Sequence, residues 1–202
     1  MPATPIAPDA PFSGAAERNK EPILDALRRL LPAQGSALEI AAGTGQHAAW
    51  FAPSLAGWSW LPSDADPASL EAIRAWTGAC PNVRDPILLD VMAAPWPGHG
   101  PALEERFDLV YCANMLHIAP WTACAALMRG AARHLAPGGL LATYGPYLED
   151  GVETSAGNLA FDRNLRERNA LWGIRRLEDV AREAGHAGLQ LAQRHAMPAN
   201  NL

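Results

Sequence analysis

Residues 36–47, Ser-Ala-Leu-Glu-Ile-Ala-Ala-Gly-Thr-Gly-Gln-His, decide the fold of this chain. The apolar run at 36–42 predicts a buried strand, and the closely spaced Gly43 and Gly45 predict a tight turn into a helix. Glycines let the backbone approach a ligand, and the first turn of a helix offers free N–H groups. The stretch therefore predicts a strand–turn–helix unit with a ligand at its turn; the alternative is a tight turn that binds nothing.

Strands and helices alternate on both sides of this unit. Predicted strands cover 36–42, 58–64, 83–91, 106–114, 139–147 and 188–198, and predicted helices cover 15–31, 43–56, 67–76, 121–135, 161–173 and 175–185. Pro86 confines the start of its strand to an irregular or edge position. Such alternation builds βαβ units and a parallel sheet with helices on both faces. The prediction is a Rossmann-like, doubly wound α/β domain with a mainly parallel sheet over 15–202, after a flexible arm at 1–14.

Length and composition fit one folded domain. The chain has 202 residues, of which 49% are hydrophobic and 18% charged, with a formal net charge of −5. The hydrophobic fraction argues against disorder, and the acidic balance argues against a nucleic-acid-binding protein, which needs a basic face. The N-terminus has no secretory signal pattern, and no apolar run reaches ~18 residues. We therefore expect a cytoplasmic protein that binds neither nucleic acid nor membrane.

The cysteines and histidines predict no metal site. Cys80, Cys112 and Cys124 form no C-x-x-C pair, and the six histidines include no H-x-x-x-H pair.

Two acidic residues support a ligand at the first turn. Glu39 lies within the first strand, where a carboxyl group is useful only if it meets a cationic or hydrogen-bonding partner. Asp64 ends the second strand, 19 residues after Gly45. In Rossmann-like domains an acid at this place binds the hydroxyls of a ribose. A nucleoside-containing ligand is therefore expected.

These residues resemble the class I S-adenosylmethionine (SAM) methyltransferases. LEIAAGTG at 38–45 fits their first motif, except that Ala41 replaces a glycine, which is tolerable if the backbone there stays β-like. The resemblance places Asp90 near the adenine amino group, Val91 over the ring, and Asn114 and Met115 at the sulfonium. APGGLL at 136–141 resembles the turn before the family's fifth strand.

Longer strings resemble one methyltransferase-like family over about residues 15–202. They include AAERNKEPIL, CANMLHIAPW, YGPY, FDRNLRERN and MPANN. The resemblance implies SAM as cofactor and S-adenosylhomocysteine (SAH) as product. Class I domains end with an antiparallel strand, and the sequence reaches Leu202 where that strand should begin. We therefore expect a sheet that is one strand short, or a fragment. The cofactor-binding residues that we expect are Arg18, Asn19, Lys20, Glu39, Ala41, Gly43, Thr44, Gly45, His47, Asp64, Asp90, Val91, Asn114 and Met115.

Two residues are candidates for catalysis. His117 follows the fourth strand and would act as a base if the acceptor arrives protonated; the alternative is a histidine that bonds a loop carbonyl. Tyr144 would orient the acceptor or form a wall of its pocket. Before the first strand, Arg18 or Lys20 would hold a carboxylate of SAM or of the acceptor; the alternative is a solvated helix start.

The expected activity is methyl transfer from SAM to a small-molecule acceptor. A small acceptor fits the acidic balance, the single domain and the lack of a recognition module. Two alternatives stay open: a catalytically silent SAM-binding or scaffolding protein, and an NAD(P)-binding oxidoreductase. The second is disfavoured because Glu39 would repel a pyrophosphate and because GTGQHA lacks the third glycine of the dinucleotide motif.

Overall fold

The computed structural model describes residues 10–202, so residues 1–9 of the predicted arm lie outside the described part. The last residues of the arm contact the domain. The Trp76 indole N–H donates to the Pro11 carbonyl at 2.7 Å, and the Ser13 hydroxyl caps the first helix. The helices are α1 (Gly14–Leu30), α2 (Gln46–Ser54), α3 (Pro67–Thr77), α4 (Trp121–His134), α5 (Ala156–Arg168) and α6 (Leu177–His186), with short 3-10 turns at Leu116–Ile118 and Pro198–Asn200.

The main sheet is parallel and confirms the predicted fold class. Its strands are β1 (Gly35–Ile40), β2 (Trp58–Asp64), β3 (Ile87–Leu88), β4 (Phe107–Ala113) and β5 (Leu135–Tyr144), in the order β3-β2-β1-β4-β5. The order reverses at β1, which pairs with β2 on one side and β4 on the other. In an open α/β sheet a ligand binds beyond the carboxyl ends of the strands at such a reversal. The residues that follow β1 and β4 therefore lie at the expected site.

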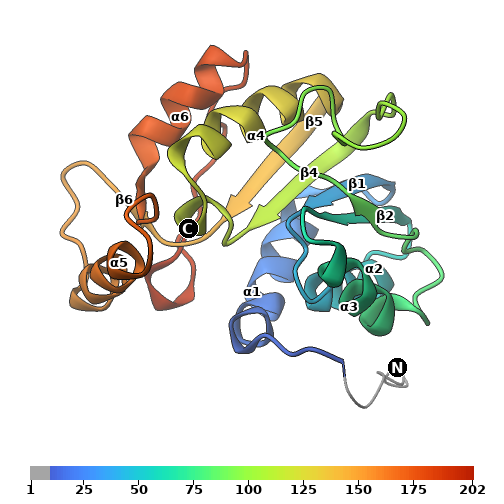
Figure 1. Cartoon of the computed structure of the whole chain (residues 1–202), viewed down its shortest axis with the longest axis horizontal. Helices are drawn as coiled ribbons and strands as arrows, with labels where there is room; N and C mark the ends of the chain where they lie inside the picture. Colours follow the sequence, from blue (N-terminus) through green and yellow to red (C-terminus); the bar gives the residue numbers. More distant parts are fainter. Residues whose placement is uncertain (1–9) are drawn as a thin grey trace.

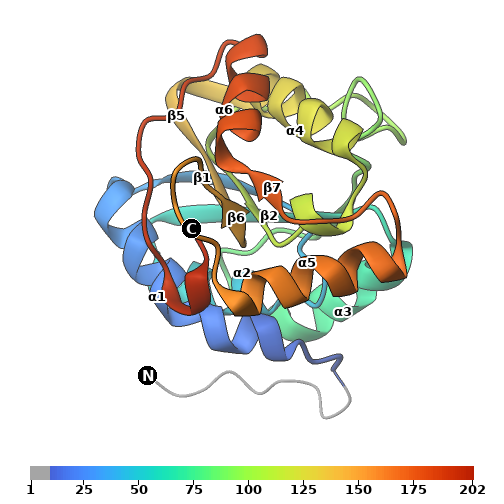
Figure 2. The same cartoon turned by 90° about the vertical axis from the view of Figure 1, so that its left-hand side faces the viewer.

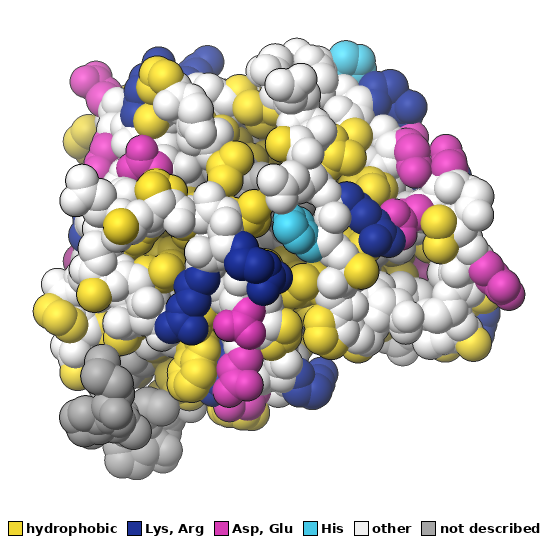
Figure 3. Space-filling view, turned by 180° about the vertical axis from the view of Figure 1, so that it is seen from behind, with side chains coloured by type: hydrophobic (Ala, Val, Ile, Leu, Met, Phe, Trp, Pro, Cys, Tyr) yellow, Lys and Arg dark blue, Asp and Glu magenta, His cyan; other side chains and the backbone are white. Residues whose placement is uncertain are grey.

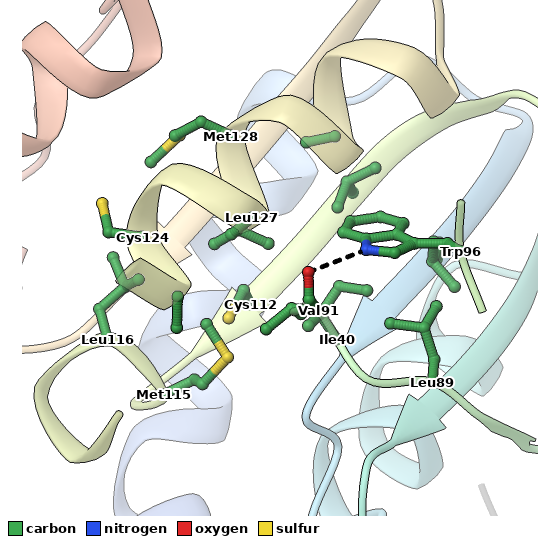
Figure 4. Close-up of a cluster of buried hydrophobic side chains, with 14 of the residues drawn as sticks. Ile40, Leu89, Val91, Trp96, Cys112, Met115, Leu116, Cys124, Leu127 and Met128 are labelled. Atoms are coloured by element: carbon green, nitrogen blue, oxygen red, sulfur yellow. Dashed lines mark hydrogen bonds between the residues drawn. The ribbon is translucent and has the colours of Figure 1, made fainter. Parts of the chain in front are cut away.

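Helices cover both faces of this sheet (Figure 1). One core cluster joins the sheet to α1 and α2, and it includes Leu24, Phe51 and Trp60. The other joins the sheet to α4 and α6, and it includes Leu127 and Val180. Figure 4 shows the second cluster, in which the Trp96 indole N–H donates to the Val91 carbonyl. Burial of these apolar side chains on both faces is what selects the two-sided fold.

The C-terminal third departs from this layered arrangement. Helix α5 lies beyond the arrowheads of β4 and β5, and Figure 2 shows α5 and the C-terminus in front of that end of the sheet. The two short strands β6 (Tyr147–Leu148) and β7 (Arg175–Arg176) form a separate parallel pair. These elements place side chains next to the carboxyl ends of the central strands.

Several predicted boundaries were wrong. The strand predicted at 83–91 is reduced to Ile87–Leu88, after the proline that restricts its start. Helix α5 begins earlier than predicted because the Ser155 hydroxyl caps it by accepting from the Asn158 N–H. The strand predicted at 188–198 is not formed; most of that segment is exposed, and Leu191 is 54% exposed. Instead, Leu202 exchanges two backbone hydrogen bonds with Gly145, at 2.9 and 3.2 Å.

Two further observations concern the described residues as a whole. No helix among them is both long enough and apolar enough to cross a lipid bilayer. No group of three or more His, Cys, Asp or Glu side chains suited to a metal ion occurs in residues 10–202.

Candidate functional site

The turn after β1 is built from left-handed backbone conformations. Gly43 and Gly45 have φ angles of 57° and 82°, and Ala41 has a φ of 55°. The expectation of a β-like backbone at Ala41 was therefore wrong, and an L-residue in this region carries a conformational cost. A side-chain carbon at Gly45 would lie 2.7 Å from the Ile73 Cα, whereas one at Gly43 would meet nothing within 4 Å. Gly45 thus allows α2 and α3 to pack closely, while Gly43 borders open space.

Asp64 lies against this turn. One of its carboxylate oxygens accepts the Gly43 N–H at 2.8 Å, and the other accepts the Asp66 N–H at 3.0 Å. Each carboxylate oxygen has more than one acceptor position, so both remain able to accept ligand hydroxyls. The structure therefore brings Asp64 and the glycine turn together, as the sequence predicted. Thr44 adjoins them, and its hydroxyl donates to the Gln46 side chain.

Glu39 is almost completely buried beneath the same turn. Its Oε2 accepts the Trp60 indole N–H at 2.7 Å, and its Oε1 has no hydrogen-bond partner among the described residues. Burial raises the pKa of Glu39 to about 8, although the Trp60 hydrogen bond acts in the opposite direction. Glu39 is therefore protonated at neutral pH, with one oxygen available to a ligand.

Four of the predicted cofactor-binding residues follow β3 and β4. The Asp90 carboxylate accepts the Met92 N–H at 2.9 Å. Val91 and Met115 belong to the core cluster of Figure 4, and each is 9% exposed. Asn114 has a φ of 61°, a conformation that asparagine tolerates, and its N–H donates to the Tyr144 carbonyl at 2.8 Å. Val91 and Met115 are therefore available to a ligand only at their edges, whereas Asp90 and Asn114 are partly exposed.

His47 does not face the open space. Its Nε2 lies 2.7 Å from Asn19 Oδ1, its Nδ1 lies 3.3 Å from the Tyr111 hydroxyl, and its ring stacks on Phe51. Burial lowers the pKa of His47 to about 4, so the ring is neutral. Both ring nitrogens are engaged within the protein, and the structure thus places His47 in the packing between α1, α2 and the sheet.

The three polar residues of α1 take different directions. Asn19 is buried against His47 and faces the Tyr144 hydroxyl. Arg18 is exposed and also lies near Tyr144, whose pKa is raised by burial and lowered in part by Asn19 and Arg18. Lys20 instead pairs with Glu17 at 2.5 Å and lies over the Trp50 ring at 4.2 Å. Of the two predicted carboxylate-binding cations, Arg18 is therefore the better placed.

Gln46 joins α1 to the glycine turn, although it was not among the residues predicted from the sequence. Its Oε1 accepts from the Ser13 N–H and the Thr44 hydroxyl, and its Nε2 donates to Glu17 at 3.3 Å. The position of Gln46 at the first residue of α2 is a signal that could have suggested this role. These bonds hold the start of α1 over the turn.

His117 and Arg175 form the part of the site nearest α5. The His117 ring meets Phe161 edge to face, with centroids 5.5 Å apart. Arg175 donates to the carbonyls of Leu116, Ala119 and Leu171, at 2.9, 2.5 and 2.9 Å. Burial, with a smaller effect of Arg175, lowers the pKa of His117 to about 4. No sequence pattern indicated Arg175, because its partners are backbone carbonyls up to 59 residues away.

A family model and several solved structures match this chain. A family model described as "Protein of unknown function (DUF938)" matches residues 10–202. An O-methyltransferase family 2 protein from Planctomyces limnophilus, solved with apigenin, superposes with a TM-score of 0.77 at 18% identity over 93% of this chain and 56% of its own. An O-methyltransferase family protein from Burkholderia thailandensis superposes with a TM-score of 0.73 at 19% identity, over 90% of this chain and 54% of its own.

A further solved structure has a bound product. CalO1, a methyltransferase of calicheamicin biosynthesis in its SAH-bound form, gives a TM-score of 0.71 at 13% identity over 93% of this chain and 52% of that chain. The chain spans little more than half the length of each of these three proteins. At such identities the similarity establishes the fold, which is that of SAM-dependent methyltransferases.

Proposed function

The chain belongs to the DUF938 family, and we propose that it transfers a methyl group from SAM to a small-molecule acceptor. The observation that carries this proposal is the placement of three features at the reversal of strand order. They are an open glycine turn at Gly43, the Asp64 carboxylate 2.8 Å from the Gly43 N–H, and the buried Glu39 with one free oxygen. Together they fit a nucleoside that also carries a positive charge.

The residues present suit SAM better than an anionic dinucleotide. Asp64 would accept hydrogen bonds from the ribose hydroxyls, and the Glu39 oxygen would accept from the ammonium group. A bound ammonium would favour the ionised form of Glu39 and pair with it, whereas a pyrophosphate would offer no such ion pair. When bound, SAM supplies a methyl group already activated by a sulfonium, so the protein needs mainly to position the acceptor and exclude water.

We propose the following roles for further residues that the sequence predicted. Asp90 and Val91 would contact the adenine, Asn114 and Met115 would lie next to the sulfonium, and Arg18 would bind a carboxylate at the mouth. Tyr144 would orient the acceptor, and His117, which is neutral because burial lowers its pKa, would receive a proton.

A small acceptor is also supported by the surface. On the face in Figure 3, Lys and Arg side chains lie beside Asp and Glu side chains rather than forming a continuous basic area. A nucleic-acid acceptor would require such an area. We propose that the acceptor is a small molecule. We also propose that the protein acts in the cytoplasm.

The proposal is tested by SAH affinity in two matched variants. Asp64→Asn removes the carboxylate that would meet the ribose, and we expect SAH to bind about 5- to 150-fold more weakly, since an unpaired buried polar group costs ~1–3 kcal/mol. Asp66→Asn, two residues away, retains the side-chain oxygen that caps α3 and should leave the affinity unchanged. Equal SAH affinity of wild type and Asp64→Asn in titration calorimetry would remove Asp64 from the site and contradict the proposal.

A further inference from the structure

Gly145 occupies an unusual place beside the predicted catalytic residues. It is buried directly after β5, and both its N–H and its carbonyl are bonded to Leu202. Its φ lies outside the left-handed region, so its backbone does not require glycine. A side-chain carbon at Gly145 would lie 3.4 Å from His117 Nδ1 and 3.9 Å from Asn114 Oδ1. The missing side chain therefore leaves a methyl-sized space between two polar atoms.

Neither polar atom is satisfied by the protein. Within residues 10–202, no hydrogen bond reaches His117 Nδ1 or Asn114 Oδ1. The fully buried side-chain nitrogen and oxygen atoms without a partner in that part of the chain are His134 Nε2 and Glu178 Oε2. His117 Nδ1 and Asn114 Oδ1 are not among them, so neither atom is fully enclosed by the protein.

Both residues are held firmly. The Asn114 N–H is bonded to the Tyr144 carbonyl, which fixes the end of β4 against the end of β5. The His117 carbonyl accepts the Gly173 N–H at 3.0 Å, and Arg175 binds the carbonyls on either side, at Leu116 and Ala119. The two acceptor atoms thus sit on rigid backbone, as a site that positions a reacting atom requires.

The polar atoms around this space favour a ligand group that donates hydrogen bonds. The charged group that influences His117 is Arg175, and it helps burial to keep the ring neutral by lowering its pKa. The nearby Asp162 is engaged by Arg166 and by the Ile174 N–H. An unprotonated imidazole nitrogen and an amide oxygen both accept hydrogen bonds, so they match a hydroxyl or an amine as donor.

We propose that Gly145 forms the base of the acceptor subsite and that the acceptor atom is a hydroxyl oxygen or amine nitrogen that still carries a proton. This inference rests on the proposed methyltransferase function and specifies its substrate class. An acceptor hydroxyl donates its one proton to His117 Nδ1, and an amine with two protons donates to both His117 Nδ1 and Asn114 Oδ1. These bonds aim the lone pair of the acceptor atom at the methyl group. This assigns Asn114 to the acceptor as well as to the cofactor.

The reaction balances with His117 as the proton carrier. The lone pair of the acceptor atom forms the bond to the methyl carbon while the bond between that carbon and sulfur breaks, and its electron pair stays on the sulfur of neutral SAH. His117 Nδ1 takes the proton of the acceptor atom and releases it to water. Acceptors without such a proton, including thioethers and tertiary amines, are excluded.

Sinefungin tests this subsite without knowledge of the acceptor. In this analogue of SAH an amine-bearing carbon replaces the sulfur, so it presents N–H donors where the methyl group would be transferred. We expect wild type to bind sinefungin about tenfold or more tightly than SAH, the effect of hydrogen bonds to a charged donor. Gly145→Ala fills the space and should reduce this ratio to about one without weakening SAH. Gly185→Ala, where a side-chain carbon meets nothing within 4 Å, is the control.

A second variant keeps the test independent of how Gly145→Ala folds. His117→Phe removes one acceptor and should also lower the ratio of the two affinities. If SAH binds wild type but sinefungin binds no more tightly, or if both variants keep the wild-type ratio, the acceptor subsite is refuted while the proposed function stands. If neither compound binds, the proposed function itself fails.

Discussion

Glu39 gives the stability of this protein a dependence on pH that a glutamine variant removes. Burial raises its pKa from 4.5 to about 8. Between these values the folded state keeps a proton that the unfolded state has lost, so the free energy of unfolding decreases as the pH rises. The free energy of unfolding falls by about 1.4 kcal/mol for each pH unit in this interval, and by about 5 kcal/mol over the whole interval.

The buried histidines act in the opposite direction. The pKa values of His47 and His117 are lowered from 6.5 to about 4, so the unfolded state binds the extra proton and stability increases with pH up to about 6.5. In wild type the two histidine contributions together outweigh that of Glu39 below about pH 6.5. They cancel when wild type is compared with Glu39→Gln at each pH, because both proteins contain the same histidines.

The difference in the free energy of unfolding between Glu39→Gln and wild type can be given a magnitude. Glutamine keeps an oxygen that accepts from Trp60 but does not titrate, so Glu39→Gln should gain about 2 kcal/mol over wild type between pH 6 and pH 8. Urea unfolding followed by tryptophan fluorescence measures this difference, with the exposed Glu104→Gln as the matched control. A difference between Glu39→Gln and wild type that stays constant from pH 6 to pH 8 would show that Glu39 is ionised in the folded protein and refute this reasoning.

Two further substitutions probe the turn and the support of His117. Ala41→Gly relieves the left-handed backbone at φ 55° and should stabilise the fold by up to about 1 kcal/mol, after the entropic cost of glycine; a lower urea midpoint would contradict this. Arg175→Gln removes the cation that helps to lower the pKa of His117, so NMR titration should show that pKa above about 4, and an unchanged value would show that Arg175 has no such effect.

The local features of the site could be predicted from the sequence. The turn at 41–45 and the acid at the end of β2 depend on residue types at short separations, and alternation of strands and helices sufficed for the parallel sheet. The pairing of Lys20 with Glu17 is equally local, three positions apart, and would have shown that Lys20 is engaged.

The rest depended on contacts between distant segments. His47 is directed inward by Tyr111, 64 residues away, and by Asn19, 28 residues away, and no pattern around His47 reveals either partner. The segment 188–198 has a strand-like pattern, but a strand also needs a neighbour along its length. Among the described residues, the pairing of this segment is limited to an isolated bridge between Met197 and Asn201. Pattern alone therefore predicted the strands and the glycine turn of the candidate site but not the direction of each side chain.

The central claim is that the turn at Gly43, with Glu39 and Asp64, binds the nucleoside of SAM. Calorimetric titration of the wild-type protein with SAH, and in parallel with NAD, tests it most directly. The account predicts micromolar binding of SAH with one site per chain and no binding of NAD. Binding of NAD alone, or of neither compound, would contradict it.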